Sequence, residues 1–413
     1  MRKGLLSTLA ILVTTLLAVG DVALATEHRA QTVTIVNLNV FHGIDCVPIR
    51  GEQCRLADRL ALLFARLAAQ GCPDIVTFQE VLDRTTVETL TPDGQLLTLT
   101  NLTSVLALIQ ATLPPLSQVC GFEYNFLYAA DLVTPPQAPL FQGTDEELIL
   151  SRYPIVEQDL RLLHSALYDP TNPALRFFAR HVLFARIQHP VGLIDVFTTH
   201  LAASEDFGDN PCHSQLSFPL FGGVTFDVAC PAECDASATV RVCEARQVVN
   251  FVKAHHDVPT PGFLTGDFNA PPSSAEYTEI IQAASGSQPW IDSHLAVGNP
   301  ECDSATGIGC TGGRVAIKLD GSSELEEPAL NVDTRGDFTF VVPPADSSAC
   351  AGRLLTPAGP VTGTGIFAGT PNPFTPSCGP LPLPICWASD HNGTMVNLSC
   401  TPEAEAKKEM AQR

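Results

Sequence analysis

Several polar residues with side chains suited to catalysis or metal binding end or flank apolar, strand-like runs of this sequence. In chain order they are Asn39, Glu80, His200, Asp267, Asn269, Asp337, Asp390 and His391. Polar groups at the mouth of a sheet converge on one cleft, while the apolar strands beneath hold them rigid. We therefore expect these side chains to form one site.

The residue types indicate a reaction class. Carboxylates and amides without a Cys/His cluster suit a hard cation, Mg²⁺ or alternatively Ca²⁺ or Mn²⁺. Two histidines suit general acid and base work near neutral pH. Together they predict metal-assisted hydrolysis of a phosphate ester. No Gly-x-Ser-x-Gly elbow and no glycine-rich phosphate loop is found in the sequence.

Composition and charge narrow the class of protein. Hydrophobic residues make up 45% of the 413 residues, which is enough for a core and excludes a wholly disordered chain. The formal charge is −21, because 44 Asp and Glu outnumber 23 Lys and Arg. This argues against attachment to nucleic acid or anionic lipid through a basic surface. It leaves open an enzyme that reaches phosphate through a metal ion.

The two ends of the chain differ from the rest. Residues 1–25 combine a basic start, a 15-residue apolar stretch from Leu5 to Val19 and the small residues Ala23 and Ala25. This pattern predicts a signal peptide cleaved after Ala25; the alternative, an uncleaved anchor, needs a longer apolar stretch. We therefore expect a secreted or periplasmic monomer without a stable membrane span. Residues 402–413 are a charged tail to which we assign no function.

The 14 cysteines all follow residue 25 and are even in number, which predicts structural disulfides in an oxidising compartment. Three pairs close in sequence are candidates to staple loops: Cys46/Cys54, Cys302/Cys310 and Cys378/Cys386. The rival interpretation is a zinc site built from Cys230, Cys234, Cys243 and His213. Their spacing matches none of the usual zinc patterns.

Strand and helix patterns alternate along the mature chain. Strands are expected over residues 32–40, 75–81, 148–151, 177–187, 193–200, 262–268, 337–342 and 394–398. Helices are expected over 56–67, 101–113, 240–256 and 274–284, the second ended by Pro114-Pro115 and the last capped by Ser273 or Ser274. Residues 202–238 and 343–385 are expected to be loop insertions. The mixed order predicts one large α/β domain with mixed sheets.

Seven short motifs occur along the chain in an order that is known from one protein superfamily. They are Leu38-Asn39-Val40, Phe78-Gln79-Glu80-Val81, Ile149-Leu150-Ser151-Arg152-Tyr153-Pro154-Ile155, Thr199-His200-Leu201, Gly266-Asp267-Phe268-Asn269, Arg335-Gly336-Asp337-Phe338 and Ser389-Asp390-His391. From about residue 32 to 398 the chain resembles the DNase I-like endonuclease/exonuclease/phosphatase superfamily. That superfamily includes apurinic endonucleases, sphingomyelinases and inositol polyphosphate 5-phosphatases.

The resemblance implies a fold and a metal site. The fold is α/β (α+β), a four-layer sandwich of two mixed β-sheets packed face to face with helices outside, in a catalytic domain of residues 26–401. Glu80 corresponds to the principal metal ligand, supported by Asn39 and Asp390.

The resemblance also implies catalytic roles. His391 corresponds to the catalytic histidine, and Asp337 would orient it and favour its charged form. Gly336 departs from the apolar residue usual in that motif, which leaves Asp333 as an alternative to Asp337. Asp267 and Asn269 would bind phosphate and orient water or the leaving group. His200 would contact phosphate or protonate the leaving oxygen, and water would attack in line without a covalent intermediate.

Neighbouring residues have two interpretations each. Two roles are considered for Arg176 and Arg180: they bind a substrate phosphate, or they form ion pairs on the surface. Glu147 is a candidate to orient His200, whereas His181 is expected to be a half-buried strand residue.

The substrate stays open between nucleic acid and phospholipid. A phospholipid phosphodiesterase needs an exposed apolar loop, for which Phe218, Leu220 and Phe221 or Ile366-Phe367 are candidates, unless they are loop core. A soluble phosphomonoesterase and an inactive binding module are the remaining alternatives.

Overall fold

The structure, a computed structural model, describes residues 31–90, 96–132, 146–166, 179–204, 207–218, 224–227, 230–286, 288–344, 365–369 and 385–400. The expected signal peptide, the charged tail, Arg176 and Cys378 lie outside these residues. Within the described ranges, no helix is both long enough and apolar enough to cross a bilayer.

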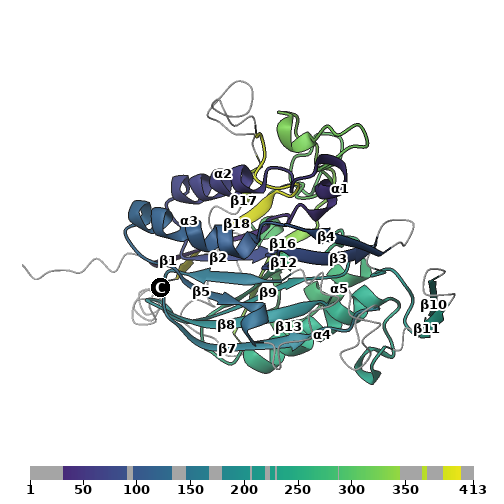
Figure 1. The fold of residues 1–413 in the computed structure, drawn as a ribbon. Helices are drawn as coiled ribbons and strands as arrows, with labels where there is room; N and C mark the ends of the chain where they lie inside the picture. Colours follow the sequence, from purple (N-terminus) through teal and green to yellow (C-terminus); the bar gives the residue numbers. More distant parts are fainter. Residues whose placement is uncertain are drawn as a thin grey trace, which may run out of the picture.

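Two six-stranded sheets form the centre of the molecule (Figure 1). The first has the order β17 (Gly365–Phe367), β18 (Gly393–Cys400), β1 (Gln31–Asn39), β2 (Ile75–Gln79), β6 (Leu148–Ser151) and β5 (Asn125–Tyr128). The second has the order β15 (Ile291–Asp292), β16 (Asp337–Val342), β12 (Gly262–Asp267), β9 (Gly192–His200), β8 (His181–His189) and β7 (Ile155–Leu162). The pairs β1–β2 and β12–β9 are parallel and the others antiparallel, so both sheets are mixed, as predicted.

Three buried apolar clusters define four layers, which confirms the expected sandwich. One cluster lies between the sheets and includes Val33 and Ile35 of β1 and Val196 of β9. A second joins the first sheet to α2 (Leu56–Ala69) and α3 (Val105–Cys120). The third joins the second sheet to α4 (Val240–His255) and α5 (Ala275–Ile281), on the opposite face (Figure 1). Each sheet is therefore apolar on both faces.

The long helices follow their sequence signals, with one exception. In α2 the residues Leu56, Leu60 and Leu63 are buried at helical spacing. Helix α3 was expected to end at Pro114, but it continues through both prolines to Cys120. A disulfide from Cys120 to Cys72 holds its last turn against the end of α2, so tertiary anchoring outweighs the lost backbone donors.

The remaining elements are short. The α-helices are α1 (Val47–Arg50) and α6 (Ser293–Ala296), and the 3₁₀ helices are η1 (Ile44–Cys46), η2 (Ala129–Leu132), η4 (Ala232–Cys234) and η5 (Glu324–Glu326). Two-stranded hairpins are β3 (Thr86–Leu90) with β4 (Leu96–Thr100), β10 (Gln215–Phe218) with β11 (Val224–Asp227), and β13 (Ala284–Ser285) with β14 (Gln288–Pro289).

Several of these strands were missed from the sequence. The segment 202–238 was expected to be a loop, yet it contains the β10–β11 hairpin, and β17 within 343–385 extends the first sheet. Strands β5 and β7, and the hairpin β3–β4, were also not expected. Most of these strands have only three to five residues, which is too short for a clear alternation signal, and β7 is exposed along most of its length.

Five disulfides lie among the described residues, which supports the disulfide interpretation of the cysteines. Two of them, Cys212–Cys230 and Cys234–Cys243, use the cysteines of the rival zinc site, so that interpretation is wrong. The pairs Cys46–Cys54 and Cys302–Cys310 form as expected.

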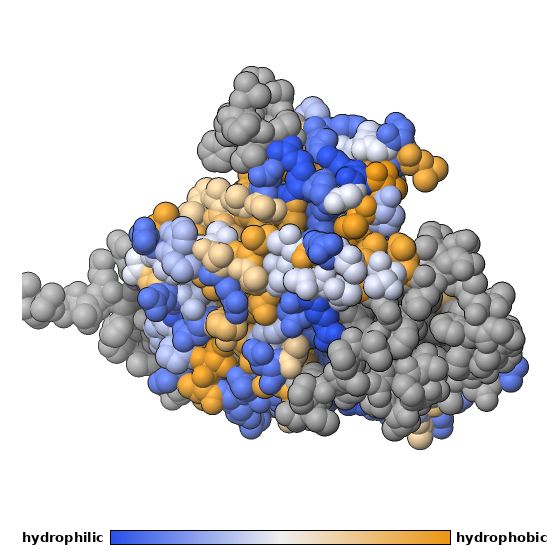
Figure 2. Space-filling view, viewed as in Figure 1, coloured by the Kyte–Doolittle hydropathy of each residue, from blue (hydrophilic) through white to orange (hydrophobic). Residues whose placement is uncertain are grey.

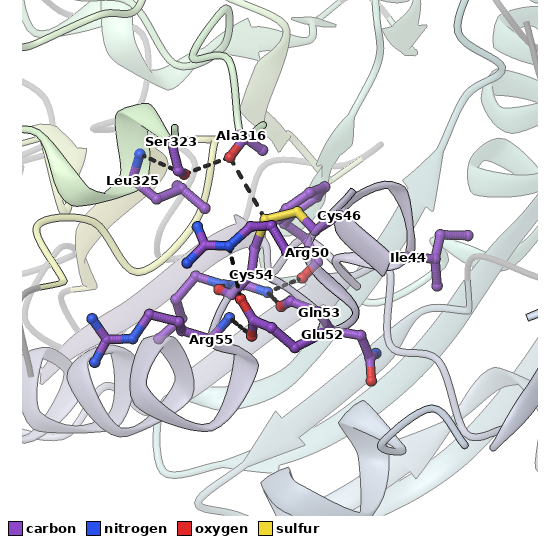
Figure 3. The surroundings of a disulfide bond; sticks show 12 residues. Ile44, Cys46, Arg50, Glu52, Gln53, Cys54, Arg55, Ala316, Ser323 and Leu325 are labelled. Carbon is purple, nitrogen blue, oxygen red and sulfur yellow. Dashed lines mark hydrogen bonds and ion pairs between the residues drawn. A yellow bond between two sulfur atoms is a disulfide. The ribbon is translucent and has the colours of Figure 1, made fainter. Parts of the chain in front are cut away.

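Figure 3 shows that the first of these loop pairs lies beside the segment around residue 316. Sγ of Cys54 is 3.6 Å from the Ala316 carbonyl, which also accepts a hydrogen bond from Ser323. This contact joins the loop after β1 to the loop before β16.

Candidate active site

On the two sheet faces that pack against each other, residues change from apolar to polar toward the ends of β1 and β12. In β1, Ile35 belongs to the core between the sheets, and Asn37 and Asn39 follow at a spacing of two on the same face. In β12, Phe263 is followed in the same way by Thr265 and Asp267. The candidate site therefore lies where the core between the sheets ends.

The second sheet presents a row of three site residues. His200 ends β9, Asp267 ends β12 and Asp337 begins β16. The strand register places Asp267 directly opposite both His200 and Asp337. None of the three is more than 3% exposed. Cross-strand pairing therefore sets the spacing of this row.

The first sheet supplies Asn39 and Glu80. Asn39 ends β1, and its Nδ2 donates to Oε1 of Glu80 at 2.8 Å and to Oδ2 of Asp267 at 3.1 Å. Its Oδ1 accepts a hydrogen bond from the Phe41 backbone N–H at 2.9 Å. One buried amide thus joins carboxylates from the two sheets. Glu80 follows β2 in a left-handed conformation, with φ at 60°, which turns it toward Asn39.

The turn after β1 holds the other oxygen of Glu80, a contact that the sequence interpretation missed. The backbone N–H of His42 donates to Oε2 of Glu80 at 3.0 Å. Nε2 of the His42 ring lies 3.6 Å from the same oxygen. Arg59 of α2 donates to the carbonyls of Val40 and Phe41, both at 2.9 Å. Burial lowers the pKa of Arg59 to about 10 although Asp390 and Glu80 oppose this. A buried cation therefore fixes the turn.

His391, which is half-buried, forms an ion pair with the buried Asp337. Its Nδ1 lies 2.9 Å from Oδ2 of Asp337. Burial opposes charging of His391, but the carboxylates of Asp337, Asp267 and Asp390 raise its pKa well above the ordinary value. The pKa of Asp337 is raised to about 6. Burial and the negative charge of Asp267 raise it, and the positive charge of His391 opposes them. Because the histidine has the higher pKa, the proton belongs to His391 at neutral pH.

Asp337, not Asp333, is therefore the partner of His391. Asp333 is exposed on the surface. Gly336, the departure from the usual motif, donates its backbone N–H to Oγ1 of Thr311, as does Asp337. Thr311 is thus a supporting residue that motif reading missed.

Asp267 is shared by the rest of the site. Its Oδ2 lies 3.6 Å from Nε2 of His200 and 3.6 Å from Nδ1 of His391, and its Oδ1 accepts from the Asn269 backbone at 2.9 Å. Burial alone would raise the pKa of Asp267. The charge of His391 and the hydrogen bonds from Asn269 and Asn39 outweigh burial and lower it. Asp267 is therefore a carboxylate at neutral pH.

His200 has a different environment from His391. Its Nδ1 lies 3.0 Å from the guanidinium of Arg180, and its Nε2 lies 2.9 Å from Nδ2 of Asn269. Arg180 is 1% exposed, so the surface ion pair considered for it is wrong.

Glu147, considered as a partner of His200, lies beside His181, whose Nδ1 is 3.9 Å from Oε2 of Glu147. His181 is fully buried rather than half-buried. Burial, together with the charge of Arg180, lowers the pKa of His181 to about 4.

Asp390 completes the set of oxygen donors. It is half-buried between Ser389 and His391, and its Oδ1 accepts a hydrogen bond from Oγ of Ser389 at 3.0 Å. The same hydroxyl lies 2.6 Å from the Asn39 carbonyl, which brings this loop to the end of β1. Carboxylates and an amide with no sulfur donor fit a hard divalent cation. A second group, Asp267, Asp337 and His391, has one potential ligand atom each within 4.8 Å of one another, but these atoms already pair.

A buried polar layer beneath the site links the two sheets. Nε2 of Gln79 donates to Oδ1 of Asn37 at 2.9 Å and to Oγ1 of Thr198, in the other sheet, at 2.8 Å. Nδ2 of Asn37 donates to the Gly266 carbonyl at 3.2 Å. Gln79 was noted from the sequence as a polar residue at a strand end. Asn37 and Thr198 were not selected, although their spacing of two from Asn39 and His200 was a usable signal. Satisfied buried networks rigidify what they join.

No family model matches the chain, and no curated protein sequence matches it. Among solved structures, it is similar to truncated TDP2 from Caenorhabditis elegans, at 14% identity over 90% of this chain and 99% of that one, with a TM-score of 0.47. It is similar to an endonuclease/exonuclease/phosphatase from Beutenbergia cavernae, at 15% identity over 91% and 72%, with a TM-score of 0.46. A family protein from Bacteroides thetaiotaomicron gives 14% identity over 90% and 98%, with a TM-score of 0.48.

The last two structures carry the name of the superfamily that the motif order resembles.

Proposed function

We propose that this chain is a secreted, divalent-metal-dependent phosphodiesterase with a catalytic domain of residues 26–401. One observation carries the proposal. The His391–Asp337 ion pair, the carboxylate Asp267 and the oxygen donors around Glu80 converge at one end of the two sheets.

The metal would be held by Glu80, with support from Asn39 and Asp390. The bound cation supplies neutralisation of charge on the phosphoryl oxygens. On the protein side, Asn39 and the His42 backbone N–H each hold one oxygen of Glu80, which fixes the carboxylate before the metal arrives.

The other residues act on substrate and water. His391, as imidazolium, donates a hydrogen bond from Nε2 to a phosphate oxygen, because its Nδ1 is held by Asp337. Asp267, ionised at neutral pH, accepts the proton of the attacking water. Asn269 orients the phosphate. Attack is in line with the leaving oxygen and forms no covalent intermediate.

A diester is favoured over a monoester by charge. A diester has one negative charge at neutral pH, whereas a monoester approaches two. The site contains four carboxylates, on Glu80, Asp267, Asp337 and Asp390. We therefore expect the smaller anion to bind better.

A phospholipid diester is a second, more specific candidate. Leu319 is 99% exposed in the segment 302–334, and a Cβ on Gly312 of the same segment would lie 3.5 Å from the His391 ring. Figure 2 shows hydrophobic residues at the upper right of the molecule, where Figure 1 draws this segment in light green beside α1. The loop candidate Ile366-Phe367 fails, because Phe367 is buried. Phe218, Leu220 and Phe221 lie outside the described side chains.

The test is one panel on the purified mature chain. It offers plasmid DNA, RNA, sphingomyelin vesicles, a soluble diester and a soluble monoester, each with Mg²⁺ or Ca²⁺, with EDTA and His391→Ala as controls. The proposal expects metal-dependent turnover of a diester that is lost in the variant. Turnover of the monoester alone, or turnover unaffected by EDTA, would contradict it. Leu319→Ser should slow only the vesicle reaction if the substrate is a phospholipid.

A further inference from the structure

His200 and His391 face partners of opposite charge. His391 contacts the Asp337 carboxylate, whereas Nδ1 of His200 lies 3.0 Å from the Arg180 guanidinium. Both His200 and Arg180 are almost completely buried, so water does not screen this contact. The two histidines therefore lie in electrostatically different surroundings.

A guanidinium limits the states open to His200. Arginine has five N–H donors, no acceptor, and does not lose its proton in proteins. Nδ1 of His200 must then present its lone pair to Arg180, and the proton of the neutral ring sits on Nε2. An imidazolium would direct its Nδ1–H at the guanidinium and place two cations in buried contact.

Two further contacts of His200 bear on this tautomer, and the first agrees with it. Nε2 faces Oδ2 of Asp267 at 3.6 Å, a carboxylate that can only accept. Asp267 is shared with His391 at the same distance, so it does not hold a charge for His200 alone. Nδ2 of Asn269 lies 2.9 Å from Nε2 and also donates to the Leu201 carbonyl. Asn269 is the partner that yields, because its amide can rotate at the cost of its hydrogen bond to Leu201, whereas the guanidinium has no acceptor in any orientation.

We propose that Arg180 is a positioning residue that keeps His200 neutral with its proton on Nε2, so that His200 binds the substrate phosphate as a hydrogen-bond donor and does not protonate the leaving oxygen. This inference rests on the proposed function for its catalytic meaning. The tautomer itself can be measured without any substrate. Of the two roles considered for His200, only phosphate contact fits a neutral ring, whose Nε2–H is a far weaker acid than an imidazolium.

The direct test is a two-bond ¹H–¹⁵N correlation spectrum of the mature chain labelled with ¹⁵N-histidine, with His200 assigned from the peaks missing in His200→Gln. The pattern of a neutral ring with Nε2–H, unchanged from pH 6 to pH 8, is expected. An Nδ1–H tautomer, or an imidazolium at pH 7, would overturn the proposal. A chain that turns over no substrate still gives this answer, so failure of the inference and failure of the proposed function are distinguishable.

A kinetic test compares glutamine with alanine at each histidine position, because the glutamine amide retains a neutral N–H donor and alanine does not. His200→Gln should be at least tenfold faster than His200→Ala, whereas His391→Gln should be no faster than His391→Ala, because His391 acts as a cation. Equal rates for His200→Gln and His200→Ala would contradict a donor role.

Arg180→Met and Arg180→Lys test the positioning. Loss of the Nε2–H pattern in Arg180→Met and its retention in Arg180→Lys are expected. An Nε2–H pattern that persists in a folded Arg180→Met chain would show that Arg180 does not set the tautomer. Thermal unfolding of each variant confirms that it is folded.

Discussion

The two sheets present their site residues in different ways. The second sheet places His200, Asp267 and Asp337 directly opposite one another in its hydrogen-bonded register. The first sheet places Glu80 just beyond a strand end, in a left-handed conformation, and holds it through Asn39 and the turn at His42. Backbone pairing sets the row on the second sheet, whereas side-chain and turn hydrogen bonds hold Glu80 on the first. We infer that the second sheet positions the phosphate and water while the first positions a metal ligand.

Removal of the charged histidine should have the largest effect. His391→Ala eliminates the imidazolium beside the phosphate, and we expect the turnover number to fall by about 10³- to 10⁴-fold. His213→Ala is the matched control, because His213 is exposed. Steady-state rates with unchanged circular dichroism check the prediction. A loss below tenfold would remove His391 from the chemistry.

Glu80→Gln should produce a metal-dependent defect. The amide keeps the size of the side chain but removes a charged oxygen, so affinity for Mg²⁺ should fall by about 10- to 100-fold, with partial recovery of the rate at high Mg²⁺. Titration calorimetry with Mg²⁺ checks this directly, and Glu123→Gln, an exposed carboxylate, is the control. Unchanged Mg²⁺ affinity would contradict a metal site on the first sheet.

Asp337→Asn should change the pH dependence. Asp337 raises the pKa of His391, so its removal lowers that pKa, and the imidazolium is lost at a lower pH. The alkaline limb of the pH–rate profile should move to lower pH, with a loss of about 10²-fold at pH 8. A profile that is reduced in height but not shifted would show that Asp337 does not control the charge of His391.

The smallest effect on activity is expected from a change in the outer helix layer, away from the site residues of both sheets. The Cys72–Cys120 disulfide joins the ends of α2 and α3 in the outer layer. Cys72→Ser with Cys120→Ser should lower the free energy of unfolding by about 3–4 kcal/mol without changing the turnover number at 25 °C. Denaturant titration and initial rates measure the two quantities. A large rate loss would mean that the outer layer also shapes the site.

Sequence motifs predicted the four layers and the residues that converge, because strand ends bearing polar residues keep their order along the chain. They missed contacts that depend on three-dimensional approach. Arg180 was interpreted from strand periodicity alone, and nothing local indicated that it reaches His200. His42 acts on Glu80 through its backbone N–H, which no residue type reveals. Helix α3 passes Pro114 because a distant cysteine anchors it.

The central claim is that this site hydrolyses phosphodiesters with the help of a divalent metal. The most direct measurement is the rate of bis(4-nitrophenyl) phosphate hydrolysis by the mature chain across a Mg²⁺ titration, with 4-nitrophenyl phosphate in parallel. We expect a saturable rise in diester hydrolysis with Mg²⁺, abolished by EDTA and by His391→Ala, and slower monoester hydrolysis. A rate that is independent of Mg²⁺, or equal in His391→Ala, would contradict it.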